Sequence, residues 1–148
     1  MSNENLYAEA MIIKGNRLFN KSKFEEAAEM YQRAARWSGE KLLDRDIIYE
    51  ALRLAISAWL SACMAENASN ILLSLPQETR LPILKDLINK ILTEVDYLVD
   101  NNKHKLAIEH LNMFIKLYHD NNLMSELKKL NSKQLSVVDL LMKRGINK

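Results

Sequence analysis

The sequence predicts an all-α protein built from helical hairpins. The chain has 148 residues, of which 48% are hydrophobic and 27% are charged, as is typical of a single soluble domain with a sizeable core. It holds only three Gly and two Pro, so few positions can break a helix. In several stretches, polar and apolar residues follow the period of a helix. We therefore expect one domain over residues 1–148, made of long helices joined by short turns.

The first hairpin is expected over residues 5–37, with a turn at residues 21–23. The small residues Gly15 and Ala27 would let its two helices approach closely. Larger side chains would fill the space around that contact, and these are Phe19, Phe24 and Tyr31.

This hairpin resembles the tetratricopeptide repeat over roughly the first quarter of the chain. The residues that carry the resemblance are Gly15, Asn16, Phe19, Lys23, Phe24, Glu26, Ala27, Ala28, Tyr31, Ala34 and Ala35. Two positions depart from the family pattern: Met11 replaces an early Trp or Leu, and Gly39 replaces the closing Pro. We expect Gly39 to end the helix in a left-handed cap. The resemblance implies a right-handed α-solenoid of about three antiparallel hairpins plus a carboxy-terminal helix, and a function in binding.

The second hairpin is expected over residues 44–75. Its first helix would start at the cap Asp44 and continue to residue 65. The helix carries one narrow polar stripe on an otherwise apolar surface, formed by Asp46, Glu50, Arg53, Ser57 and Ser61. Asn67 would cap the shorter second helix, and Pro76 would stop it.

The third hairpin is expected over residues 79–119, capped at Thr79 and tolerating Pro82 in the first turn of its first helix. Small residues give a common register for the three hairpins, at Ala27, Ala68 and Ala107. A short helix at residues 121–130 and a last helix at residues 132–144, ended by Gly145, would complete the chain.

Several function classes are not expected. Three isolated Gly cannot form a phosphate-binding loop, so no nucleotide cofactor is predicted. The histidines His104, His110 and His119 are six and nine positions apart, whereas two ligands on one helix face need three or four, so no metal site is predicted. The single Cys63 favours a reducing compartment, and no signal peptide or membrane span is recognised, so we expect a cytoplasmic protein. No catalytic residues are recognised, and we do not expect an enzyme.

The predicted function is that of an adaptor that binds a protein or peptide in a concave groove. By register with Gly15 and the polar stripes, the groove-facing residues on the first, third and fifth helices are Glu9, Ile12, Asn16, Asn20, Glu50, Arg53, Ser57, Ser61, Asn89, Thr93, Asp96 and Asp100. A solvated face without function is an equally open interpretation of each residue. The groove is mildly acidic, so a basic or helical ligand is expected.

Some tetratricopeptide repeat proteins hold a terminal carboxylate with an Asn and a Lys four residues before it. Asn16 matches the first position, but Ile12 stands in place of the Lys, so this recognition is not expected.

Two alternatives stay open. A homo-oligomer, such as a homodimer, could assemble through apolar edges of the repeats. Nucleic acid is not the expected partner at a net charge of +2, but an accessory role is the other alternative. Such a role would use the basic tail, formed by Lys128, Lys129, Lys133, Lys143, Arg144 and Lys148.

The last helix has an apolar face, which carries Leu135, Val138, Leu141 and Met142. This face would either cap the solenoid or occupy the groove.

Overall fold

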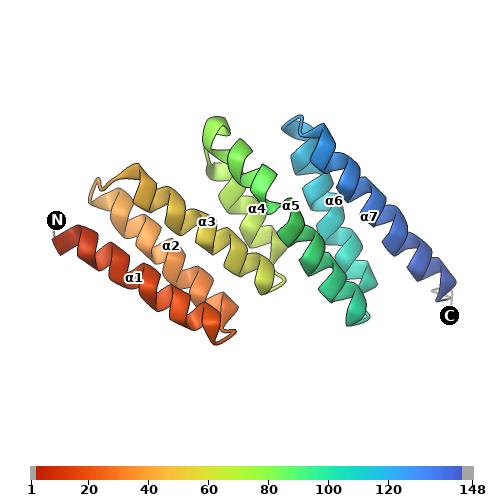
Figure 1. Ribbon diagram of the computed structural model, residues 1–148, viewed down its shortest axis with the longest axis horizontal. Helices are drawn as coiled ribbons and strands as arrows, with labels where there is room; N and C mark the ends of the chain where they lie inside the picture. Colours follow the sequence, from red (N-terminus) through yellow and green to blue (C-terminus); the bar gives the residue numbers. More distant parts are fainter. Residues whose placement is uncertain (1–2, 145–148) are drawn as a thin grey trace. The chain divides into compact units, whose positions relative to one another are not determined.

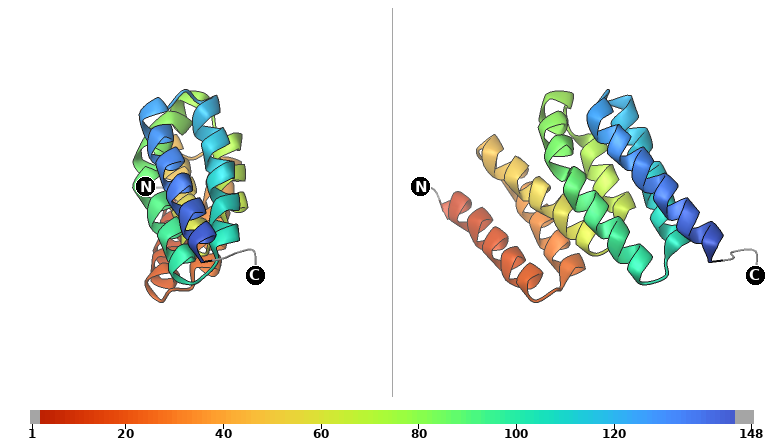
Figure 2. Two further views of the ribbon diagram at one scale, coloured as in Figure 1. Left: turned by 90° about the vertical axis from the view of Figure 1, so that its right-hand side faces the viewer. Right: turned by 45° about the vertical axis from the view of Figure 1, so that its right-hand side comes forward.

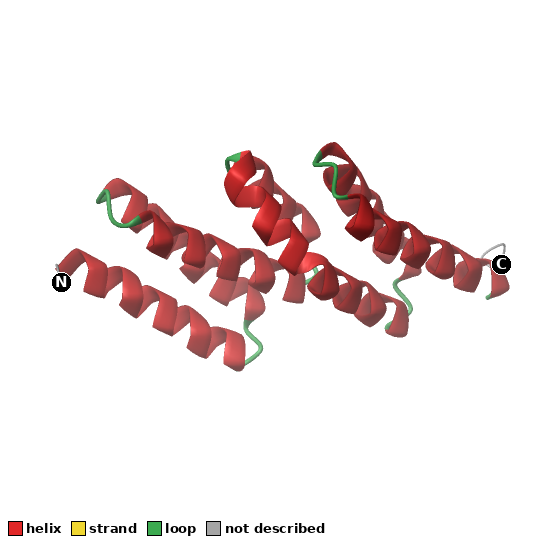
Figure 3. Ribbon diagram, turned by 45° about the horizontal axis from the view of Figure 1, so that its top comes forward, coloured by secondary structure: helices red, strands yellow, loops and turns green. Residues whose placement is uncertain are grey.

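The computed structural model describes residues 3–144, and these form seven α-helices without any strand (Figure 1, Figure 3). The helices are α1 (Asn3–Asn20), α2 (Phe24–Glu40), α3 (Arg45–Ser61), α4 (Ala65–Ser74), α5 (Gln77–Asp100), α6 (His104–Asp120) and α7 (Met124–Lys143). The predicted all-α fold class is confirmed. The described residues divide into two compact units, unit 1 up to Ile71 and unit 2 from Leu72 onward. No helix in the described part combines the length and apolar character that a membrane span requires.

The same three-residue turn follows five of the seven helices. In the turn after α1, the N–H of Ser22 donates to the carbonyl of Phe19, and the N–H of Lys23 donates to the carbonyl of Leu18. This Schellman motif satisfies carbonyls that the helix end leaves free. The middle residue of each turn has a left-handed backbone, with φ between 53° and 61°, at Ser22, Leu42, Cys63, Asn102 and Asn122. None of these residues is Gly, so the repeated turn leaves no simple signal in the sequence.

The prediction that Gly39 ends a helix in a left-handed cap is wrong, because Gly39 lies inside α2. The left-handed residue is Leu42, three positions later, and the N–H of Leu42 donates to the carbonyl of Gly39 at 3.2 Å. Leu42 is 90% exposed, so no burial of its side chain compensates for the left-handed backbone.

Further helix boundaries also differ from the predictions. Asn67, the predicted cap of the shorter helix in the second hairpin, lies inside α4, which begins at Ala65. The helix expected to reach residue 65 ends at Ser61, because Cys63 takes the left-handed conformation of the common turn. The helix expected to be capped by Thr79 begins earlier, because the carbonyl of Pro76 accepts the first bonds from the amides of Thr79 and Arg80. Pro82 therefore lies beyond the first turn of α5.

The end of the chain differs most. One continuous helix, α7, replaces the short helix and the last helix that were expected on either side of residue 131. Asn131 and Ser132 lie inside α7 and are exposed, so their preference for caps and turns is overridden. Gly145, the predicted end of the last helix, lies outside the described residues.

Unit 1 is built on a close approach of helices. Helix α2 packs against both α1 and α3, and α1 also contacts α3 (Figure 1). At the crossing of α1 and α2, a Cβ atom on Gly15 would lie 2.5 Å from Cε1 of Tyr31. Small residues fill the interior around this crossing, and Ala8, Ala27, Ala28, Ala34, Ala51, Ala55 and Ala58 are all fully buried. The role predicted for Gly15 is therefore confirmed.

Unit 2 has a core of larger side chains. Helix α6 packs against α5 and α7, and α5 also contacts α7 (Figure 2). The core residues include Leu84, Ile91, Val95, Leu98, Leu111, Phe114, Leu130 and Val137. Deep in this core, the Tyr118 hydroxyl donates to the carbonyl of Leu84 at 2.6 Å.

The three small residues used for the register occupy similar places after their turns. Ala27, Ala68 and Ala107 are fully buried. Each donates its amide to the residue that ends the preceding turn, at 2.9, 3.4 and 3.0 Å. Equivalent positions in the two units can therefore be found by counting from the turns.

Candidate functional site

Three helices of unit 1 surround an open pocket of about 350 Å³, here named the α1–α3 pocket. Its lining combines amides and a hydroxyl with aromatic and aliphatic side chains, and consists of Asn16, Phe19, Asn20, Tyr31, Leu54 and Ser57. The Phe19 ring also meets the Phe24 ring edge-on, with 4.9 Å between the centroids. This contact fixes one apolar wall of the pocket.

The polar groups of the α1–α3 pocket are only partly used within the protein. The Tyr31 hydroxyl donates to Oδ1 of Asn16, which leaves the Nδ2 donor of Asn16 available. Burial raises the pKa of the Tyr31 phenol above its ordinary value, so this donor stays protonated at neutral pH. Asn20 and Ser57 also contribute side chains that can donate and accept hydrogen bonds. The pocket can therefore offer several hydrogen-bonding groups to a ligand.

No charged residue lines the pocket, but charged residues lie farther along the same helices. Glu9 precedes Asn16 by two helical turns on α1, and Glu50 precedes Ser57 by two turns on α3. Arg53 lies one turn from Ser57, and all three charged side chains are exposed. The surface beyond the pocket is therefore weakly acidic.

The structure brings together Asn16, Asn20 and Ser57, which the sequence predicted to share one surface. The placement of Ile12 on that surface is wrong, because Ile12 is only 9% exposed and belongs to the core. Its side chain is buried together with those of Met11 and Ala8 on the same helix. Ser61 is partly exposed near the end of α3 and does not line the pocket.

The four predicted residues on α5 belong to unit 2, and all are exposed: Asn89, Thr93, Asp96 and Asp100. Two of them already have partners within the protein. The Thr93 hydroxyl donates to the carbonyl of Asn89 at 2.8 Å. Nζ of Lys133 on α7 donates to Oδ1 of Asp96 at 2.8 Å, so one predicted acid is neutralised by the chain itself.

The sequence predicted a basic tail that includes Lys128, Lys129 and Lys133, but not the second hollow, of about 550 Å³, that these lysines line on α7. Its lining is basic and rich in serine, and consists of Ser125, Lys128, Lys129, Ser132, Lys133 and Ser136. The helical spacing of these residues was the available signal. It was interrupted by the helix break predicted near residue 131. The pocket-lining roles of Phe19, Tyr31 and Leu54 were also missed, because each was assigned to the core.

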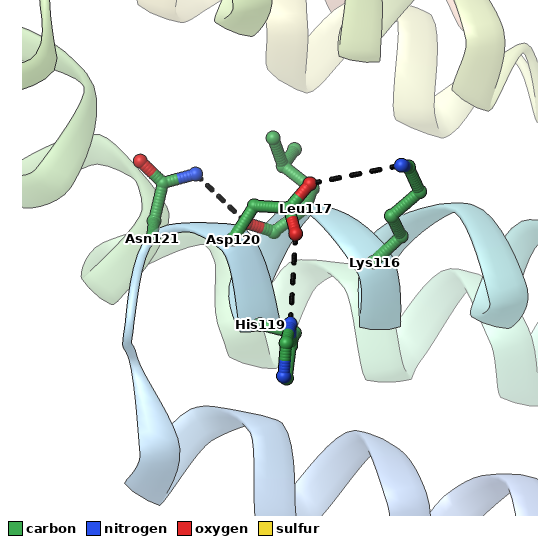
Figure 4. A network of polar contacts seen from close by, with 5 residues as sticks. All are labelled: Lys116, Leu117, His119, Asp120 and Asn121. Carbon is green, nitrogen blue, oxygen red and sulfur yellow. Dashed lines mark hydrogen bonds and ion pairs between the residues drawn. The ribbon is translucent and has the colours of Figure 1, made fainter.

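Polar side chains also gather at the end of α6 (Figure 4). Oδ2 of Asp120 forms an ion pair with Nζ of Lys116 at 3.8 Å, and Oδ1 of Asp120 lies 3.5 Å from Nδ1 of His119. Nδ2 of Asn121 donates to the carbonyl of Leu117 at 2.7 Å, so Asn121 closes the helix end. Among residues 3–144, no group of three or more His, Cys, Asp or Glu is placed to hold a metal ion.

Comparisons with known proteins add no assignment. No family model matches the chain, and neither a curated protein nor a solved structure matches it significantly.

Proposed function

We propose that this protein is a non-catalytic protein–protein interaction module that binds a peptide segment in the α1–α3 pocket. The observation that carries the proposal is the pocket lining, in which three helices combine free amide and hydroxyl groups with an apolar wall. Such a lining suits a peptide, whose backbone needs hydrogen bonds while one side chain needs apolar contact. The protein is a cytoplasmic adaptor without a cofactor in this proposal.

The proposed architecture is a right-handed solenoid of tetratricopeptide-like hairpins. It is supported by the repeated turn and by the common register of Ala27, Ala68 and Ala107. In this architecture the first helix of each hairpin faces the ligand.

The proposed ligand is a segment with one bulky apolar residue and a neighbouring basic residue. Phe19, Tyr31 and Leu54 would contact the apolar side chain, and Nδ2 of Asn16 would donate to a backbone carbonyl. Exposed Glu9 and Glu50 along the same helices favour a basic neighbour, since they provide charge complementarity.

A peptide array tests this proposal. Peptides with one central apolar residue, flanked by lysine or by glutamate, would be screened against the whole protein and followed by amide chemical shifts. Lysine-flanked peptides are expected to shift amides of the pocket residues. Ser57→Leu fills the pocket and should weaken binding about ten-fold or more. Asn70→Ala, at an exposed position of α4, is the control that should leave binding unchanged. The proposal would be contradicted if both peptide sets bound equally well, or if the Ser57→Leu variant bound the lysine-flanked peptides as tightly as the original protein does.

A homo-oligomer is the second candidate, because α1 exposes an apolar row. Leu6 and Ile13 are about half exposed, and they lie on one helix face with Ala10 between them. Sedimentation at several concentrations tests this candidate. A self-association that Ile13→Glu abolishes would support it, and a monomer at all concentrations would exclude it.

A further inference from the structure

The outward surface of α7 combines an apolar row with a basic row. The apolar row holds large side chains that share one helix face, and Met124, Leu135 and Met142 are each at least 60% exposed. Val138 extends this row with a 36% exposed side chain. Positions 124, 135, 138 and 142 fall together because their spacings match whole helical turns. Between Met124 and Leu135 the same face carries Lys128 and Asn131, so the continuous apolar part of the row covers residues 135–142, roughly 10 Å at 1.5 Å per residue.

The basic row lies beside the apolar row and forms the hollow on α7. Lys128 and Lys129 are exposed, whereas Lys133 is held by Asp96 of α5. Three serines line the hollow beside the lysines and supply hydroxyl donors, and these are Ser125, Ser132 and Ser136. The outward surface of α7 is therefore cationic along one edge, with Asp139 as its exposed acid.

The opposite side of α7 is fully used within unit 2. Leu127, Leu130 and Val137 are buried there. The amide of Gln134 donates to Asn112 of α6, and Nη1 of Arg144 donates to Asn102 at 2.6 Å. Helix α7 is thus anchored by one face, and the outward face can receive a partner without any rearrangement of that anchoring.

We propose that the outward face of α7 docks an amphipathic helix of a protein partner, whose apolar face is edged by Asp or Glu residues. The apolar row would be covered by the partner's apolar side chains, and the carboxylates would meet Lys128 and Lys129. The outward face of α7 is positively charged, so it should bind an acidic partner better than a basic one, because complementary potentials attract. This surface belongs to unit 2 and is cationic, whereas the α1–α3 pocket belongs to unit 1 and is lined by no charged residue.

Charge also argues against a second copy of this chain as the occupant. In an antiparallel pair of α7 helices, the two basic rows would lie along the same edge of the seam, so like charges would meet. Nucleic acid would gain little here, because Lys133 is already paired and few free cations are left to contact phosphates.

The test uses the whole protein and two synthetic helices of about 18 residues, long enough to cover the apolar residues 135–142 and to reach Lys128 and Lys129. Both peptides carry leucine on one face, and their flanking positions hold glutamate in one and lysine in the other. Fluorescence anisotropy would measure binding at low and high salt. The glutamate peptide should bind more tightly than the lysine peptide, and its affinity should fall as salt is raised.

Variants locate the binding surface. Lys128→Glu combined with Lys129→Glu should reverse the preference, so that the lysine peptide binds better. Leu135→Ser should weaken both peptides about ten-fold, as expected for an apolar anchor. The matched controls change equally exposed residues elsewhere in unit 2 and should leave binding unchanged: Lys85→Glu combined with Lys105→Glu, and Leu73→Ser.

Several outcomes would overturn the proposal. These are equal binding of the two peptides, no preference reversal in the double lysine variant, or equal losses in the controls. A dimer of the protein alone that Leu135→Ser abolishes would assign the surface to a second copy. Binding to phosphatidylserine vesicles, but not to the glutamate peptide, would assign it to lipid. Loss of peptide binding in the α1–α3 pocket would affect none of these measurements, so the two proposals fail separately.

Discussion

The two units share one turn but distribute side-chain volume differently across the helices that it joins. The left-handed residues Ser22 and Asn102 lie at the same place in the turns after α1 and α5. Counting back from each turn makes Gly15 of α1 equivalent to Val95 of α5. Unit 1 places no side chain at this position, and the Tyr31 ring fills the space from the other helix. Unit 2 places a fully buried aliphatic side chain there.

The partner helices complete the difference. By the same count, Leu111 of α6 stands where Tyr31 stands on α2, and both are buried. Unit 1 therefore pairs a very small residue with a large ring, whereas unit 2 pairs two aliphatic residues of similar size. One glycine controls the close approach in unit 1, so unit 1 should be the less tolerant of added volume.

The polar surface follows from this packing. The ring that lies over Gly15 also brings its hydroxyl to Asn16, and this bond shapes the α1–α3 pocket. At the equivalent position in unit 2, Asp96 reaches Lys133 of α7 instead. The same helix face thus forms a neutral, hydrogen-bonding pocket in one unit and an ion pair in the other.

The largest expected effect is that of Gly15→Leu. Even a Cβ atom would lie 2.5 Å from the buried Tyr31 ring, so the ring or the helices must shift, and a loss of about 3 kcal/mol or more is expected. Gly39→Leu is the matched control, because an added Cβ there meets nothing within 4 Å. The control should change stability by less than about 1 kcal/mol, in the stabilising direction. Urea unfolding of both variants would check this, and equal effects would remove the special role of Gly15.

The next largest losses of stability are expected when the hydroxyls of the buried tyrosines are removed. Tyr118→Phe removes the hydroxyl bond to Leu84 inside the core of unit 2, with an expected cost of about 1–3 kcal/mol. Tyr31→Phe removes a bond to the exposed Asn16, with an expected cost of about 0.5–1.5 kcal/mol. Urea unfolding of the two variants gives the comparison. A larger loss for Tyr31→Phe would show that its hydrogen bond to Asn16 stabilises the fold more than the hydrogen bond from Tyr118 to Leu84 does.

The same two tyrosines should make the stability of the protein depend on pH in the alkaline range. Burial raises the pKa of the Tyr118 phenol, with a further contribution from the charge of Glu126, and burial alone raises that of Tyr31. Because the folded-state pKa is raised, each buried phenol contributes stability that is fully present below about pH 10, the ordinary pKa of tyrosine. This contribution is lost as the pH rises further. Tyr118→Phe should therefore flatten the fall of stability between about pH 10 and pH 12. Unfolding curves at several alkaline pH values measure it, and an unchanged slope would contradict this assignment.

Much of unit 1 could be predicted from sequence, because Gly15 and Ala27 leave a steric signal that local pattern reveals. The grouping of Asn16 with Ser57 also followed, since helical periodicity places polar residues on one face. Ile12 was misplaced because periodicity locates a face only to within about one residue, and apolar character decided its burial.

The turn at Cys63 could not be predicted, because a left-handed non-glycine residue leaves no compositional mark. The continuity of α7 was missed for a different reason. The local preferences of Asn131 and Ser132 favour a break, whereas the tertiary contacts of Leu130 and Val137 hold the helix together. The lysines of α7 were predicted as a basic tail, but the surface that they form with the serines was missed because a helix break was expected near residue 131.

The smallest expected effect is the coupling between Asp96 and Lys133. Their side chains are 55% and 28% exposed, so solvent screens most of the attraction. A double-mutant cycle with Asp96→Asn and Lys133→Met should give a coupling below about 1 kcal/mol that disappears at high salt. The cycle on Lys116 and Asp120 is the control, because that pair is longer, at 3.8 Å, and still more exposed. Its coupling should be near zero. A salt-independent coupling above about 2 kcal/mol for the first pair would mean that the ion pair contributes to holding α7 as strongly as its buried side chains do.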